Sequence, residues 1–463
     1  MVGVLHGLGV GIAVLLLAWT GLLYLPFRWR PVGLYLFVPK VAAGALTPFI
    51  AAAGLVLALL GVLRDSWWMA VPAGLASLGA TMVIARLGLV RADLAAALGP
   101  DWARRIPTER RARMVSRWWR GRLPTVPEPH LRQDVVFGFV PGTGRALLCD
   151  VWQPPADVPP SGLAVVYLHG SAYYILDKDF GTRPLFRHLA AQGHVIVDVA
   201  YRLFPETDVP GMVGDAKRAV AWVKTHAADL QIRPDQIVLA GGSAGGHLAL
   251  LAAYAQEGPT LMPAELAGSD PEVCATVSLY GQVDLAAMYD HLSQQKICRP
   301  DDPQPDWDAP PPRWMLRLFG PNAGRLRLQH MAVAGRSDWL VGGTPGEIPD
   351  RYDQVSAMHA VHPGCPTTLL VHGLQDEMAP VAAVRQLHQR LRQAGVPVTA
   401  VYLPHTDHAF DWIATAWSPP ARAAIHVLER FLAVLAATGR RSSAQPATGS
   451  RAEPVGLPEA LPL

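Results

Sequence analysis

A short glycine-rich turn at residues 241–245 constrains this chain more than any other feature. The run Gln236-Ile-Val-Leu-Ala240 before it is short, apolar and β-branched, which predicts a buried strand. The run Leu248–Ala255 after it predicts a helix. Between them, Gly241-Gly-Ser-Ala-Gly245 fits G-x-S-x-G, in which a strand turns directly into a helix and lifts a serine hydroxyl clear of the sheet. The alternative is a glycine-rich turn with an incidental serine, so the pattern needs support from the rest of the chain.

The first 90 residues contain very few charges and three apolar stretches, Val4–Phe27, Val41–Leu63 and Trp67–Val90. Each reaches the ~20 residues that a helix needs to cross a bilayer. We therefore predict a three-helix transmembrane region over residues 1–90. A cleaved signal peptide over residues 1–27 is the alternative. It has only His6 before the apolar run, however, and no small-x-small cleavage site.

Basic residues predict the orientation of these spans, because positive charge accumulates on the cytoplasmic side of a membrane. Arg28, Arg30 and Lys40 fall in the first connection, while the second holds only Arg64 and Asp65. A basic juxtamembrane linker follows at residues 91–129. Within it we predict a helix over 104–122 that lies on anionic lipid, with a solvated basic linker as the alternative. The pattern predicts an integral membrane protein with its N-terminus outside and its remaining chain on the cytoplasmic side.

From about residue 130 the pattern alternates between strands and helices, which predicts a doubly wound, mostly parallel α/β sheet over 130–437. A long piece between Tyr280 and Pro366, rich in proline and tryptophan, interrupts this alternation. We interpret it as a cap insertion at about 282–365. The segment 438–463 is rich in proline, serine and alanine, and we predict a disordered tail there. The expected strands are 135–140, 146–152, 163–168, 195–200, 236–240, 274–279, 367–371 and 398–403, and the expected helices include 182–192, 212–230, 380–394 and 419–437.

Charge and cysteine content argue against several classes of partner. The formal net charge of +3 comes with no nucleic-acid recognition motif, so we expect no nucleic-acid partner. The four cysteines form no C-x-x-C pair and have no histidine at zinc-ligand spacing. We expect free thiols, no metal site and no cofactor.

A serine hydroxyl is a weak nucleophile at neutral pH, so Ser243 needs a general base, an acid that orients it and an anion-stabilising pocket. After this type of turn the partners follow in the order serine, acid, histidine. Asp376 stands just beyond a predicted strand, where ligands meet open α/β sheets. His408 follows the next predicted strand, and His405 is the alternative base. We expect Asp407 and Asp411 to cap or solvate the loop, and His247 to be structural.

The pocket for the negative charge needs backbone N–H groups. Ala244, directly after the serine, supplies one. The loop His169-Gly-Ser-Ala-Tyr173, which follows an earlier predicted strand, should supply the other, and it must be held in place to do so.

With these residues assembled, the chain from about 130 to 437 resembles the α/β-hydrolases of the hormone-sensitive-lipase and feruloyl-esterase-like carboxylesterase group. Four motifs carry the resemblance: His169-Gly-Ser-Ala172, Tyr201-Arg-Leu-Phe-Pro-Glu206, Gly242-Ser-Ala-Gly-Gly-His-Leu-Ala249, and His372-Gly-x-x-Asp376 paired with His408-Ala-Phe410. The resemblance implies Ser243 as nucleophile, His408 as base and acid, and Asp376 as the orienting carboxylate. It also implies the oxyanion donors and supporting motif residues Ser171, Ala172, Ala244, His169, Gly170, Gly241 and Gly245.

Two departures from the family pattern are relevant. Ser171 and Ala172 replace the second and third glycines of the oxyanion loop, which makes the loop stiffer. Gly242 stands where lipase-like relatives often carry an acidic residue, which favours the feruloyl-esterase-like and formamidase-like branch.

We therefore expect a membrane-anchored serine hydrolase that cleaves a carboxylic ester through an acyl-enzyme. The apolar anchor and the tryptophan-bearing cap favour a lipophilic small-molecule substrate and the lipid bilayer as partners. Three alternatives stay open: an amidase or formamidase with the same three residues, a catalytically inactive membrane-bound interaction module, and a transport element coupled to the hydrolase.

Overall fold

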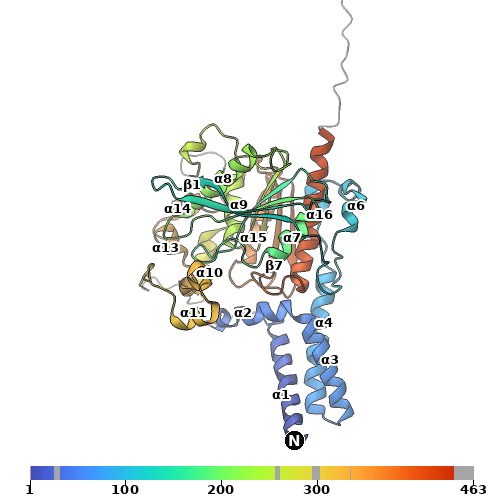
Figure 1. Ribbon diagram of the computed structural model, residues 1–463. Coiled ribbons are helices and arrows are strands. Elements are labelled where there is room, and N and C mark those ends of the chain that lie inside the picture. The colour runs from blue at the N-terminus through green and yellow to red at the C-terminus, as the bar shows by residue number, and fades with distance from the viewer. Residues whose placement is uncertain (1, 26–31, 256–260, 295–302, 334, 443–463) are drawn as a thin grey trace, which may run out of the picture.

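The computed structural model describes residues 2–25, 32–255, 261–294, 303–333 and 335–442 (Figure 1). Arg28, Arg30, Cys298 and the predicted tail from residue 443 onward lie outside these ranges. The last helix, α16 (Pro419–Ser442), extends beyond the end predicted at residue 437. The cysteines in the described part of the chain, Cys149, Cys274 and Cys365, are free thiols, as predicted.

The described residues contain an eight-stranded sheet with the order β1-β2-β4-β3-β5-β6-β7-β8. The pairs β1–β2 and β2–β4 are antiparallel, and all other neighbours are parallel. The predicted mostly parallel α/β sheet is therefore confirmed. The strands are β1 (His130–Phe139), β2 (Ala146–Gln153), β3 (Ala164–Leu168), β4 (Val195–Val199), β5 (Ile237–Gly242), β6 (Ala275–Leu279), β7 (Thr367–Gly373) and β8 (Val398–Leu403).

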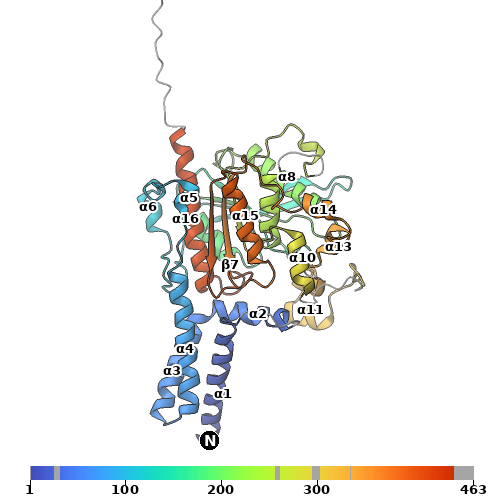
Figure 2. The same ribbon diagram turned by 180° about the vertical axis from the view of Figure 1, so that it is seen from behind.

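Helices cover both faces of this sheet, which explains why the central strands β3 to β6 are buried along their whole length. Alternate residues of β3 belong to different cores. Val166 packs with α8 (Val209–Thr225), α9 (Ala244–Tyr254) and α15 (Val381–Gln393). Val165 packs with α7 (Arg183–Ala190) and α16 on the other face (Figures 1 and 2).

The interruption predicted between β6 and β7 is built from short helices. Two of them, α10 and α11, lie beside helix α2 (Val32–Ala45) in both views of the molecule (Figures 1 and 2). The α-helices of this segment are α10 (Leu285–Gln294), α11 (Arg313–Phe319), α12 (Asn322–Arg325), α13 (Ser337–Val341) and α14 (Pro349–Gln354).

The N-terminal region forms a bundle that projects away from the sheet (Figure 1). Helices α1 (Val2–Gly21), α3 (Thr47–Leu63) and α4 (Trp67–Gly88) run side by side. Helix α2 lies across the top of this bundle, between it and the sheet. The C-terminal half of α4 packs into the core on the α16 face of the sheet through Val83 and Leu87. The bundle is thus joined to the α/β domain by packing as well as by the chain.

The second predicted span, Val41–Leu63, is not one straight helix. Helices α2 and α3 meet at Leu46 with an angle of 77°. Pro48 explains the break, because a proline fits the first turn of a new helix but cannot continue the hydrogen bonds of the preceding one. In the described residues, one helix, α4, is long and apolar enough to cross a membrane, or two if the bent pair forms one span. This count is lower than the three predicted spans.

The prediction of one juxtamembrane helix over 104–122 is wrong. The chain there forms a 3₁₀ turn (Trp102–Arg105) and the short helix α6 (Thr108–Ala112), and then runs without regular structure along α16. The backbone N–H of Val115 donates to Glu429 at 2.8 Å, and the indole of Trp119 donates to the carbonyl of Trp417 at 2.7 Å. Glu429 thus satisfies a backbone N–H that a helix would pair internally, and Trp119 adds a side-chain contact with the residues before α16.

Candidate active site

The glycine-rich turn folds as the sequence predicts, with β5 ending at Gly242 and α9 beginning at Ala244. Ser243 between them has φ 53° and ψ −123°, a strained conformation for a residue with a side chain. Its N–H donates to the carbonyl of Leu279 at 2.9 Å, which holds the turn against β6. Cβ atoms at Gly241 or Gly245 would overlap backbone atoms, so glycine is required at both positions.

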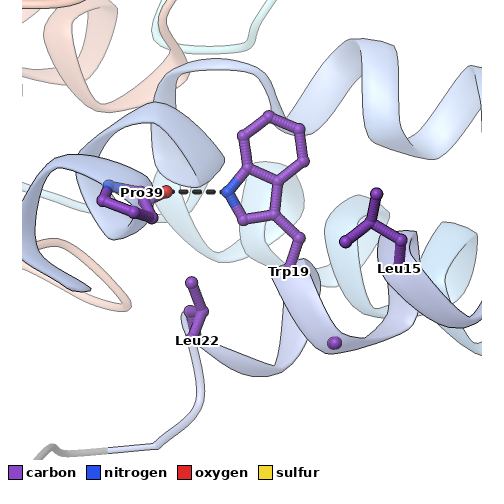
Figure 3. Close-up of a pocket in the computed structure, with 5 residues that line it drawn as sticks. Leu15, Trp19, Leu22 and Pro39 are labelled. Carbon is purple, nitrogen blue, oxygen red and sulfur yellow. Dashed lines mark hydrogen bonds between the residues drawn. The ribbon is translucent and has the colours of Figure 1, made fainter. Parts of the chain in front are cut away.

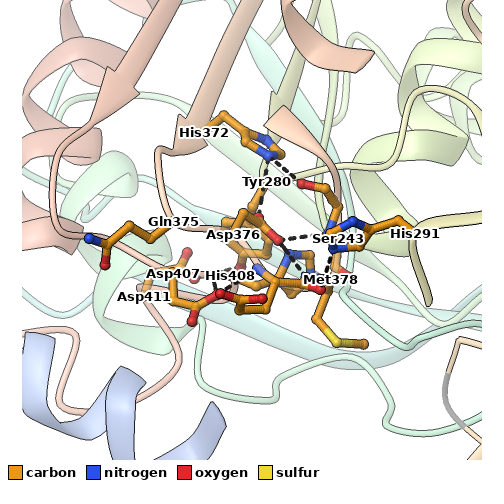
Figure 4. A network of polar contacts seen from close by, with 12 residues as sticks. Ser243, Tyr280, His291, His372, Gln375, Asp376, Met378, Asp407, His408 and Asp411 are labelled. Atoms are coloured by element: carbon orange, nitrogen blue, oxygen red, sulfur yellow. Dashed lines mark hydrogen bonds and ion pairs between the residues drawn. The ribbon is translucent and has the colours of Figure 1, made fainter. Parts of the chain in front are cut away.

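The structure brings Ser243, His408 and Asp376 into one hydrogen-bonded chain (Figure 4). Ser243 Oγ lies 2.7 Å from His408 Nε2, and His408 Nδ1 lies 2.9 Å from Asp376 Oδ2. The three residues follow β5, β8 and β7 respectively. Because the carboxyl ends of parallel strands share one edge of the sheet, residues far apart in sequence converge there.

Asp376 is fully enclosed and well supplied with hydrogen-bond donors. Its Oδ1 accepts from the backbone N–H groups of Met378 at 2.9 Å and Ala379 at 2.7 Å. Burial by itself raises the pKa of this carboxyl, but the neighbouring His408 and His372 imidazoles and these hydrogen bonds outweigh it, so the pKa lies below its ordinary value. An ionised Asp376 accepts a hydrogen bond from His408 Nδ1–H, which leaves Nε2 free to accept one from the Ser243 hydroxyl.

The alternative base, His405, lies elsewhere. Its Nδ1–H donates to the carbonyl of Leu23 at 3.0 Å, and Arg86 donates to its Nε2 at 3.0 Å. His405 therefore joins the α/β domain to α4 and to the turn that follows α1, and its hydrogen-bond partners do not include Ser243.

The remaining polar residues near the turn also have structural partners. Asp411 accepts a hydrogen bond from the hydroxyl of Tyr280 at 2.5 Å. Asp407 is buried, and its Oδ1 accepts from the backbone N–H of His408 at 2.7 Å, so of its two expected roles it caps the loop and does not solvate it. His247 Nε2–H donates to the carbonyl of Val355 at 2.7 Å, and burial lowers the pKa of His247 to about 4. It is a neutral core residue, consistent with its predicted structural role.

The predicted oxyanion loop follows β3 and is held by Tyr201. The Tyr201 hydroxyl donates to the carbonyl of His169 at 2.7 Å and lies 2.7 Å from Ser171 Oγ. Ser171 Oγ in turn accepts from the N–H of Tyr173 at 2.9 Å. The Tyr-Arg-Leu-Phe-Pro-Glu segment is one of the four motifs of the family resemblance, which implies no role for Tyr201. The structure shows that this tyrosine fixes the loop.

Gly170 brings the loop close to Ser243. A Cβ at this glycine would lie 3.4 Å from the Cβ of Ser243 and 3.3 Å from the carbonyl oxygen of Gly242. Ala172 has φ 46°, a conformation that glycine adopts more readily. Within the described chain, the N–H groups of Ser171, Ala172 and Ala244 donate to no other protein group. These three donors are thus available to an oxyanion.

Two family models match the chain. The model named BD-FAE matches residues 149–304, and the model of the prolyl oligopeptidase family matches residues 327–436. Esterase LipQ from Mycobacterium tuberculosis is 31% identical over 367 residues, which cover 77% of this chain and 76% of LipQ. The chain belongs to the LipQ family of α/β-hydrolase esterases.

Other relatives of this LipQ-family protein carry similar names. The probable carboxylic ester hydrolase LipM of the same organism is 30% identical, and the match covers 67% of this chain and 62% of LipM, which is less than two thirds of its length. These relatives agree on the reaction, so the LipQ-family chain is a carboxylic ester hydrolase. Among solved structures, a truncated carbohydrate esterase from gut microbiota matches with a TM-score of 0.49 and 18% identity, covering 68% of this chain and 99% of that chain.

Proposed function

We propose that the chain is a membrane-anchored serine hydrolase that cleaves the carboxylic ester of a lipophilic molecule through an acyl-enzyme. The observation that carries this proposal is the continuous hydrogen-bonded chain from Ser243 through His408 to Asp376. In this assignment Ser243 is the nucleophile, His408 the base and acid, and Asp376 the carboxylate that orients the imidazole.

The reaction proceeds in two halves. Ser243 Oγ attacks the ester carbonyl carbon while His408 Nε2 takes the hydroxyl proton. The N–H groups of Ser171, Ala172 and Ala244 stabilise the resulting oxyanion. When the tetrahedral intermediate collapses, His408 returns the proton to the leaving alcohol. Water activated by His408 then cleaves the acyl-enzyme in the same manner and releases the carboxylic acid.

Exposed apolar side chains on α1, α3 and α4 support the membrane anchor. Leu59 and Trp68 are exposed on these helices, together with Val4, Leu8, Leu55, Val56, Leu63, Trp67, Val71, Leu75 and Leu78. An apolar surface of this extent is stable in lipid and not in water. The start of α1 and the turn at Arg64 and Asp65 lie at the end of the bundle far from the sheet (Figure 1). We place that end outside the cell and the α/β domain on the cytoplasmic side.

The position of α2 supports a lipophilic substrate. This helix lies between the bundle and the edge of the sheet that carries Ser243 and His408, and the Phe37 ring lies 6.3 Å from the His408 ring (Figure 1). On the neighbouring α11, Trp314 and Leu316 are exposed. The candidate active site therefore faces the bundle, so an ester dissolved in the bilayer is close to it.

An apolar groove where α1 meets α2 provides a further lipid-compatible surface (Figure 3). It has a volume of about 400 Å³ and is lined by Leu15, Ala18, Trp19, Leu22 and Pro39. The Trp19 indole donates its N–H to the carbonyl of Pro39 at 2.7 Å, so the lining offers a ligand almost no free polar group. Such a groove suits an acyl chain.

Hydrolysis of a p-nitrophenyl ester series from acetate to decanoate tests the proposal, using the full-length protein in detergent. Turnover should disappear in Ser243→Ala, with a loss on the order of 10⁴- to 10⁶-fold in kcat, and it should be strongest on the longer chains. Equal activity of wild type and Ser243→Ala would overturn the serine mechanism. A preference for acetate would overturn the lipophilic substrate. Higher kcat/KM on a matched amide would favour the amidase alternative.

Cysteine accessibility tests the membrane arrangement. Asp65→Cys should react with a membrane-impermeant maleimide added to intact cells, whereas Asp101→Cys should react only after the cells are opened. Labelling of both variants, or of Asp101→Cys alone, in intact cells would contradict the proposed orientation.

A further inference from the structure

One cation of the N-terminal region is buried against the loops that follow β7 and β8. Lys40 lies on α2, and its side chain is only 2% exposed. Its Nζ lies 2.8 Å from Asp407 Oδ2 and 3.7 Å from Glu377 Oε1. It also donates to the carbonyl of Gln375 at 3.3 Å. A lysine from the N-terminal region thus contacts both loops that build the candidate active site.

The partners of Lys40 are adjacent to the proposed catalytic residues. Gln375 and Glu377 flank Asp376, and Asp407 directly precedes His408. The other carboxylate oxygen of Asp407, Oδ1, accepts from the backbone N–H of His408 at 2.7 Å and of Glu377 at 3.0 Å. Asp407 therefore ties the backbone of the histidine loop to the backbone of the aspartate loop.

Asp407 needs a cation to remain in this position. Its side chain is 1% exposed. Burial raises the pKa of Asp407, and the charge of Asp376 raises it further, whereas Lys40 acts in the opposite direction. A buried carboxylate without a partner either takes up a proton or moves toward water. Either change would disturb the two N–H acceptor contacts that align His408 with Asp376.

We propose that Lys40 is a positioning residue for ester hydrolysis: through Asp407 it fixes the loops that carry His408 and Asp376. The N-terminal region is then a part of the active site as well as an anchor. This inference rests on the proposed roles of Ser243, His408 and Asp376.

A second contact between the same regions provides a matched control. Arg86 on α4 donates to His405, which stands on the same loop as Asp407. Arg86 also joins the N-terminal region to the α/β domain, but no contact joins it to Asp407 in the described structure. If any contact with the N-terminal region suffices to hold the loop, loss of Arg86 and loss of Lys40 should lower kcat to a similar extent.

The experiment compares Lys40→Met, Lys40→Arg, Asp407→Ala, Lys40→Met/Asp407→Ala and Arg86→Met in the full-length protein in detergent. Active sites are counted by labelling Ser243 with a fluorophosphonate, and kcat and KM are measured on p-nitrophenyl butyrate. Lys40→Met should lower kcat by about 10- to 100-fold with little change in KM, because misplacement of a catalytic group acts on the chemical step. Lys40→Arg should restore most of the loss, and Arg86→Met should resemble wild type.

The double variant decides whether Lys40 acts through Asp407. Lys40→Met in the Asp407→Ala background should cause no further loss of kcat, since the partner is already absent. This comparison also covers the case in which Lys40→Met alone does not fold, because the double variant has no buried unpaired carboxylate at this position. An additional loss in the double variant, or a wild-type kcat in Lys40→Met, would overturn the inference. Hydrolysis that survives Ser243→Ala would instead overturn the proposed function.

Discussion

The hydroxyl oxygen of Tyr280 lies 2.7 Å from the point that a Cβ atom would occupy at Gly242. Tyr280 cannot easily move, since its hydroxyl donates to Asp411 at 2.5 Å and its ring packs against the rings of His408 and Phe410 with centroid separations of 5.0 and 4.9 Å. Tyr280 thus leaves no room for a side chain at Gly242, the residue that precedes the proposed nucleophile Ser243. A larger side chain at this position, such as an acidic residue, would overlap Tyr280 unless that ring moved.

The first prediction is that Gly242→Ala destabilises the protein and lowers its activity. The added methyl group must displace Tyr280, and overpacking of this kind costs about 1–3 kcal/mol. Because Tyr280 packs on His408, kcat/KM should fall more than stability alone explains. Thermal unfolding and ester hydrolysis measure the two effects. Gly346→Ala, at an exposed glycine with open space around it, is the control and should change neither. A fully active Gly242→Ala would show that Tyr280 moves freely.

The second prediction concerns the hydroxyl that fixes the oxyanion loop. Tyr201→Phe leaves the carbonyl of His169 without its donor and removes one of the two partners of the Ser171 hydroxyl, at a cost of about 1–3 kcal/mol. We expect kcat to fall roughly 10-fold or more, with a smaller change in KM, because the loop donors act mainly on the transition state.

Tyr402→Phe is the matched control for this substitution. The Tyr402 hydroxyl is buried and has no hydrogen-bond partner among the described residues. Its loss should leave kcat unchanged. Equal effects of the two substitutions would argue against a specific role of Tyr201 in holding the loop.

Local patterns sufficed to predict most of the α/β domain. Buried parallel strands have continuous apolar runs, so β3 to β6 were recognisable from composition alone. The order serine, acid, histidine then led to Ser243, Asp376 and His408, which the structure brings into contact. Each of these residues follows the carboxyl end of a parallel strand. Once the strand is recognised in the sequence, the residues after it can be assigned to that edge of the sheet.

Features that depend on tertiary contact could not be predicted in this way. The break at Leu46 follows from Pro48, but its 77° angle depends on how α2 packs beneath the sheet. The basic segment 104–122 lacks a long helix because Glu429 on α16 takes the Val115 N–H that a helix would pair within the segment, and this partner lies 314 residues away in the sequence. The pairing of Lys40 with Asp407 is of the same kind. Nothing in the local pattern around either residue indicates the other.

The third prediction is a loss of stability at mildly acidic pH. Burial lowers the pKa of both His169 and His247 to about 4, whereas an unfolded histidine titrates near 6.5. Below pH 6.5 the unfolded state therefore binds more protons than the folded state, and stability falls as the pH drops from 6.5 toward 4. Each histidine should contribute a loss of about 2 kcal/mol at pH 5 relative to neutral pH.

Thermal unfolding between pH 7.5 and 4.5 measures this effect. His247→Gln keeps an amide donor for Val355 and a carbonyl acceptor for Tyr173 but cannot titrate. We expect a shallower dependence of Tm on pH in this variant. His359→Gln, at an exposed histidine, should reproduce the wild-type dependence. An unchanged slope in His247→Gln would show that this side chain is not the titrating group.

The fourth prediction concerns the apolar side of the active site that α2 provides. The Phe37 ring lies 6.3 Å from the His408 ring, on the side of the sheet edge that faces the bundle. If lipophilic esters reach Ser243 from that side, Phe37→Ala removes apolar surface that their acyl chains contact. We expect kcat/KM on decanoate to fall by roughly 10-fold, corresponding to about 1.4 kcal/mol of lost contact, while the value on acetate changes little.

Phe49→Ala on α3 is the control, because Phe49 packs on Trp417 at 5.5 Å and is half exposed there. Parallel losses on acetate and decanoate would show that Phe37 supports His408 without contacting the acyl chain, and the route from the bilayer would then have to lie elsewhere.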